Sequence, residues 1–159
     1  MTTVELLTEK LNKVFSGQPW YGMPIYDIID GVTFETAFEK PANTAHNIAE
    51  ILLHMMSWTE ETMDRLNEKP ASEPVSGDWP ATGSPTEEKW QIWKDDLKLL
   101  NVNLTKAIRD LPDEKWEHPI IDERSSAPVT THTGLIEGFI EHQVYHAGQI
   151  ALLTRIINR

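Results

Sequence analysis

Two histidines near the C-terminal end, His142 and His146, stand four residues apart in the segment EHQVYHAGQI. In an α-helix this spacing puts both imidazoles on one face, about 6 Å apart along the axis. Both rings can then reach one metal ion at the roughly 2.0–2.1 Å typical of zinc–nitrogen bonds. The spacing alone fits two surface or capping histidines equally well. The adjacent apolar pattern favours a metal, because two polar rings beside a core are costly without a partner.

A third ligand has to come from another part of the chain, and His54 is the best candidate. It lies in the middle of the apolar segment IAEILLHMMSW, which has the pattern of a helix. A lone histidine on an apolar face is more often a satisfied core residue than a ligand. The pair at His142 and His146 changes that balance, because it needs a third nitrogen from a neighbouring helix.

The other three histidines fit the same site less well. His46 precedes His54 by eight residues, which in a helix is about 12 Å along the axis and about 80° around it. His132 precedes His142 by ten residues, about 15 Å by the same rise, and suits a capping or surface position. His118 stands before a proline and reads as a loop residue. We therefore predict a metal site on His54, His142 and His146.

Three neutral imidazoles favour transition metals over magnesium or calcium, and zinc, nickel and iron are the predicted ions. Three protein ligands leave a coordination position for water or substrate, as in catalytic sites. The ion could activate water, polarise a carbonyl or activate a thiol. The chain has no cysteine, so a protein thiol is excluded as the nucleophile and thiol chemistry requires a low-molecular-weight thiol cosubstrate.

Three further polar residues are weak catalytic candidates. Glu50 stands one turn before His54, and Glu141 stands directly before His142. Either carboxylate could accept a hydrogen bond behind a ligand or act as a general base, although a solvated helix face is the commoner explanation. Gln149 could orient a ligand or a bound water, and simple packing is its alternative.

Four stretches with apolar residues at helical spacing must position these side chains. The predicted helices run from about 3 to 15, from 44 to 67, from a cap at Ser84 to Pro112, and from 131 to 158. Helices of this kind joined by long connections predict a four-helix bundle, which holds metal sites on facing helices. The segment 20–41 reads as a connection with one short helix, and 116–128 as extended chain.

The segment 68–84 is a loop by composition, with three prolines and two glycines. Such a long connection in a bundle is often functional. Trp79 lies in its polar part and is a candidate lid residue, because a tryptophan in a polar loop can cover a pocket.

Length and charge limit the remaining possibilities. The 159 residues fit one domain, 1–159, and the formal net charge of −11 disfavours a nucleic-acid partner. No signal peptide or apolar stretch of membrane-spanning length is recognisable, so we expect no membrane partner and a cytoplasmic protein.

The segment GFIEHQVYHAGQIALLTRI resembles the H-x-x-x-H-x-G-Q-I signature of the DinB-like (damage-inducible) metal-binding bundles. NIAEILLHMMSW is similar to the segment that supplies the third histidine in that family, and the resemblance covers essentially the whole chain. It implies an all-α, up-down-down-up four-helix bundle with long crossing loops, often a homodimer. It also implies a divalent metal on His54, His142 and His146.

The family resemblance leaves the reaction open. Related bundles transfer low-molecular-weight thiols onto electrophiles or catalyse thiol-dependent isomerisation, and others are described as metal-dependent hydrolases. The leading hypothesis is an enzyme that activates water or a small thiol against a small-molecule electrophile, as a hydrolase or a thiol S-transferase. The alternatives are a non-catalytic metal-binding stress-response protein and a bundle without metal, whose buried histidines are satisfied otherwise.

Overall fold

Each long helix begins at a polar residue whose side chain caps its first turn. Thr86 and Thr131 each accept a hydrogen bond from a backbone N–H three residues later. Asn47 forms a full capping box with Glu50. The Asn47 side chain accepts from the Glu50 N–H at 2.8 Å, and the Glu50 carboxylate accepts from the Asn47 N–H at 2.7 Å. Thr2 makes the same reciprocal arrangement with Glu5. These caps satisfy backbone donors that the first turn of a helix leaves free.

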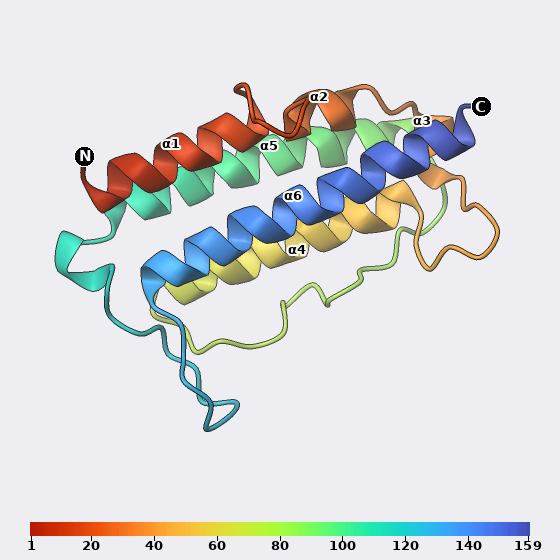
Figure 1. The fold of residues 1–159 in the computed structure, drawn as a ribbon. Helices are drawn as coiled ribbons and strands as arrows, with labels where there is room; N and C mark the ends of the chain where they lie inside the picture. Colours follow the sequence, from red (N-terminus) through yellow and green to blue (C-terminus); the bar gives the residue numbers. More distant parts are fainter.

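The computed structural model describes all residues 1–159 and is all-helical. Its helices are α1 (Thr3–Phe15), α2 (Ile25–Asp30), α3 (Phe34–Phe38), α4 (Ile48–Leu66), α5 (Glu87–Asp110) and α6 (His132–Ile157), with a 3₁₀ turn at Asp113–Lys115. The four long helices form a bundle in which α1 and α6 run one way and α4 and α5 the other (Figure 1). The predicted up-down-down-up four-helix bundle is therefore confirmed.

Two helix starts differ from the sequence-based boundaries. The expected start at Thr44 moves to Ile48, because Asn47 and Glu50 form the stronger cap. The third helix begins at Glu87 rather than after Ser84 because the Thr86 side chain caps it. In both cases a competing cap nearer to the apolar repeat determines the boundary.

The connections also hold more structure than expected. The segment 20–41 contains two short helices, α2 and α3, where the sequence predicts one. The segment after α5 is mostly irregular, and an isolated antiparallel bridge between Pro119 and Thr131 is its only β-type pairing. None of the helices has the combination of length and apolar character needed to span a membrane.

The core lies between the four long helices, where 28 hydrophobic residues are buried in one cluster. Trp90 and Trp116 lie inside this core, Trp93 is half-buried against it, and Trp58 is half-buried elsewhere on α4. Helices α4 and α6 pack side by side along the bundle (Figure 1). This pairing brings the segment around His54 opposite the segment that carries His142 and His146.

The loop between α4 and α5 runs back along the bundle, because these consecutive helices are parallel (Figure 1). Its first part is anchored by Glu61, whose buried carboxylate accepts hydrogen bonds from Arg65 Nε and from the Ser72 N–H, both at 2.8 Å. The Ala71 N–H donates to the Ile121 carbonyl at 2.8 Å. These contacts hold the start of the loop, and further along it Asp78 and Trp79 contact His54 of α4.

Candidate metal centre

The structure brings His54 of α4 together with His142 and His146 of α6. The Nε2 atom of His142 lies 3.1 Å from the Nε2 atoms of both His54 and His146. One potential ligand atom from each ring lies within 4.8 Å of the others. His54 and His146 are buried and His142 is half-buried. This group, which we call the histidine triangle, contains the three residues that the sequence predicts.

The outer nitrogens of two rings are fixed by acceptors. His54 Nδ1 lies 2.6 Å from the Asp78 carbonyl oxygen, and His146 Nδ1 lies 2.7 Å from Gln149 Oε1. Because a carbonyl oxygen only accepts hydrogen bonds, each Nδ1 carries the hydrogen and each Nε2 of a neutral ring presents a lone pair. A metal-binding histidine is commonly oriented in this way by an acceptor behind it.

The inner nitrogens cannot satisfy one another. His54 and His146 both present lone pairs toward His142 Nε2, which has at most one hydrogen to donate. At least one buried acceptor is then left without a donor, and such a group is costly. A cation that accepts all three lone pairs removes this cost. The donor set therefore fits a divalent transition metal.

The rings of α6 are held in the neutral form that metal binding requires. Burial, with smaller contributions from His146 and His54, lowers the pKa of His142 from 6.5 to about 4. Burial also lowers the pKa of His146, against the opposing effect of the hydrogen bond to Gln149. Metal ions therefore compete little with protons for these two nitrogens near neutral pH.

The loop 68–84 supplies part of the site through Asp78 and Trp79. The Asp78 carboxylate accepts a hydrogen bond from Trp58 Nε1 at 2.7 Å, which holds its carbonyl against His54. Trp79 stacks on His54 with ring centroids 3.9 Å apart and nearly parallel planes, 11° apart. Its other face stacks on His46 at 3.5 Å. Trp79 is therefore clamped between two rings.

Sequence reasoning did not identify Asp78 and excluded His46 from the site. The estimate of 12 Å for His46 assumes a helix through residues 46–54, but α4 begins only at Ile48. His46 is not a member of the histidine triangle, yet it reaches the site by stacking on Trp79. The length of the loop and its lone tryptophan were the only sequence signals for this part of the site.

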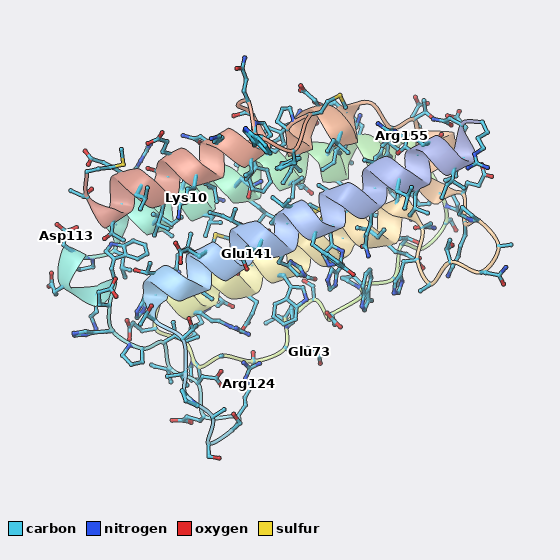
Figure 2. The ribbon with its side chains drawn as sticks, viewed as in Figure 1. Lys10, Glu73, Asp113, Arg124, Glu141 and Arg155 are labelled. Carbon is cyan, nitrogen blue, oxygen red and sulfur yellow. The ribbon has the colours of Figure 1, made fainter.

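The weak catalytic candidates lie in different surroundings. Gln149 contacts His146 directly. The Glu50 carboxylate caps α4 and lies 3.6 Å from His46 Nδ1, on the cap side of the helix. Glu141 lies on the exposed side of α6 (Figure 2). Of these three residues, only Gln149 makes a hydrogen bond to the histidine triangle.

The glycines of α6 have different roles. A Cβ atom at Gly134 would lie 2.2 Å from Thr130 Oγ1, so the Thr130 side chain would have to move to admit any larger residue there. Gly148 has no atom within 4 Å of such a Cβ and is exposed, so no neighbouring helix of this chain packs closely against it. Gly138 is equally open.

Two hollows reach the histidine triangle. The first, the His146 cavity, has a volume of about 390 Å³, and its walls include Ile51, Trp79, Tyr145, His146, Gln149 and Leu152. The second, the His142 cavity, has a volume of about 290 Å³, and its walls include Trp58, Arg65, Gly134, Gly138, Phe139 and His142. Ligands of about drug size occupy pockets of roughly 300–1,000 Å³, so the first cavity has a suitable volume.

The comparisons with known proteins agree with this geometry. A search of curated proteins found no match. The model of one protein family, the DinB superfamily, matches residues 25–150, which include all three histidines and most of the bundle. The chain therefore belongs to the DinB superfamily.

Proposed function

We propose that this protein binds one divalent transition metal on His54, His142 and His146, and uses it to activate water or a low-molecular-weight thiol against a small electrophile. The observation that supports this proposal most directly is the lone-pair geometry of the histidine triangle, where three Nε2 atoms converge without enough donors. Zinc, nickel and iron suit three imidazole ligands.

An open site supports an enzyme over a structural metal centre. The metal-binding group consists of three histidines, and structural zinc sites usually have four protein ligands. The bound ion would supply a Lewis acid that lowers the pKa of water or a thiol. The His146 cavity lies against one of the three histidines and offers room for a small molecule beside it.

The chain's own residues orient the site. Asp78 and Gln149 hold the outer nitrogens of two ligands, so that the inner lone pairs stay directed at one point. Trp79 covers one face of His54 and limits the approach of water from that side. With no cysteine in the chain, thiol transfer requires a diffusible thiol as cosubstrate, and a hydrolase requires only water.

Elemental analysis of the purified protein tests the metal centre. We expect about one equivalent of zinc, nickel or iron in the wild type, and its loss in His142→Ala. His118→Ala is the matched control, because this exposed histidine lies outside the site and only its backbone oxygen contacts His132. No bound metal after incubation with each ion would contradict the proposal.

Activity assays then distinguish the proposed enzyme from a non-catalytic metal-binding protein. The loaded wild type and the metal-free His142→Ala variant are compared for hydrolysis of small esters and for consumption of a small thiol by an aromatic electrophile. Metal-dependent turnover in either assay supports the enzyme and identifies the reaction class. Stoichiometric metal without turnover in both assays favours the non-catalytic alternative.

A further inference from the structure

The lining of the His146 cavity holds no acidic or basic side chain other than histidine and tyrosine. No lysine, arginine, aspartate or glutamate lines it, and its titratable side chains are His46, Tyr145 and His146. Ile51, Leu152 and Leu153 contribute apolar surface. Leu152 is 61% exposed, an aliphatic side chain left in water beside the cavity. A ligand with an apolar body would cover this surface favourably.

Trp79 gives the cavity a fixed wall. Both faces of its indole are covered, by His54 at 3.9 Å and by His46 at 3.5 Å, so only its edge is free to meet a ligand. The neighbouring Asp78 is tied to Trp58 and His54 by hydrogen bonds. This wall is therefore already formed before any ligand binds.

The His142 cavity on the other side has a different character. It contains Arg65, whose guanidinium donates from Nε to the buried Glu61 carboxylate at 2.8 Å and from a terminal nitrogen to the Ser72 carbonyl at 3.1 Å. The side chain of Arg65 is only 12% exposed. This cation is already paired and fixed, so neither cavity offers a free positive side chain to an anionic ligand.

We propose that the His146 cavity selects substrates whose body is uncharged and apolar, with the reactive group held beside His146 and Gln149. This inference rests on the proposed function, because the metal would hold the reactive group. A carboxylate on the body of the substrate would enter an apolar cavity without a counter-ion, which is costly. The net charge of −11 adds repulsion for anions in general.

Binding of two matched thiols to the cobalt-loaded protein tests this selectivity. The probes are benzyl mercaptan and 4-(mercaptomethyl)benzoate, which share the metal-binding sulfur and the ring and differ in one carboxylate. Thiolate-to-cobalt absorption reports binding without any need for turnover. We expect benzyl mercaptan to bind at least about tenfold more tightly to the wild type, because the extra carboxylate has no partner.

Two arginine substitutions in the lining of the cavity should each reduce this preference. Ala45→Arg and Leu152→Arg each replace an exposed lining residue, so neither change disturbs the core. A new cation beside the cavity should cut the ratio of the two dissociation constants to about threefold or less, since a charge-assisted hydrogen bond compensates the carboxylate. Leu99→Arg, at an exposed leucine of α5 outside the cavity, has the same charge change and should keep the wild-type ratio.

The outcomes separate the two proposals. Cobalt binding with equal or tighter binding of the carboxylate probe would overturn the substrate class and leave the metal centre intact. An unchanged ratio in both arginine variants would also overturn it, because the probes would then lie elsewhere. Failure of the wild type to bind cobalt, measured by elemental analysis, would overturn the metal centre and the substrate class with it.

Discussion

His132 and the histidine triangle show two ways in which this bundle buries imidazoles. His132, at the first position of α6, is 1% exposed. Its Nδ1 donates a hydrogen bond to the His118 carbonyl at 2.8 Å. Its Nε2 lies 3.2 Å from a Glu68 carboxylate oxygen but makes no hydrogen bond. Each of its nitrogens faces an oxygen acceptor. In the histidine triangle the inner nitrogens face only one another.

The difference explains why burial alone is a poor indicator of a metal ligand. His132 is more deeply buried than any member of the triangle, and its Nε2 has no hydrogen-bond partner, yet no second imidazole converges on it. What distinguishes the triangle is convergence: nitrogen lone pairs from two helices meet at one point. That convergence depends on the packing of α4 against α6, and the pattern of residues along the sequence does not directly show which helices pack together.

The largest effect on metal affinity is expected when a histidine of the triangle, rather than His132, is replaced by alanine. His146→Ala should weaken metal binding by at least about 100-fold, because it removes one of three ligands. His132→Ala should leave the metal stoichiometry unchanged. Titration of both metal-free variants with zinc, against a chromogenic chelator, measures the two affinities. Equal loss of affinity in both variants would remove the distinction between structural and metal-binding histidines.

A smaller effect is expected for the acceptor behind a ligand. Gln149→Ala removes the oxygen that orients His146, and should weaken metal binding by about 10–100-fold while the stoichiometry stays near one. Gln91→Ala is a matched control, since this exposed glutamine on α5 bonds only to Asp95. Competition with a chelator of known affinity gives the ratio. Wild-type affinity in Gln149→Ala would show that packing alone orients the ring.

His132 should matter for stability instead. His132→Ala removes a buried imidazole and its side-chain hydrogen bond to the His118 carbonyl, and should lower the free energy of unfolding by about 1–3 kcal/mol. Urea denaturation followed by circular dichroism measures this loss in the metal-free protein. A loss below about 0.5 kcal/mol would indicate that water replaces the imidazole at no cost.

The metal-free protein should also lose stability in weak acid, because the folded state disfavours protonation of His142 in the triangle. The pKa of His142 is about 4 in the folded protein against an ordinary 6.5, so between these values the unfolded chain binds more protons. The free energy of unfolding should therefore fall as pH drops from about 6.5 toward 4. Urea denaturation at pH 7 and pH 5 measures the change, and His142→Ala should show a smaller one. An identical pH dependence in both proteins would contradict this account.

The sequence predicted the bundle and the three ligands from local signals. The apolar repeats identified all four long helices, and the spacing of His142 and His146 requires only that α6 be helical. The predicted homodimer and cytoplasmic location stay predictions. The sequence marked Trp79 only as a candidate lid residue, and the contacts of Asp78 and Trp79 with His54 could not be predicted, because they depend on the path of a loop. That path depends on distant contacts such as the one between Glu61 and Ser72.

The parallel direction of α4 and α5 has a consequence for how this architecture can diversify. A chain that leaves one end of α4 must travel the length of the bundle to start α5, so the topology itself demands a long connection. In this protein that connection carries the groups that orient His54 and wall the His146 cavity. Natural variation in these loop residues can alter ligand preference while the helices that fold the domain stay the same. The fold requires a long loop at this place in any case, and the residues of that loop can change during evolution.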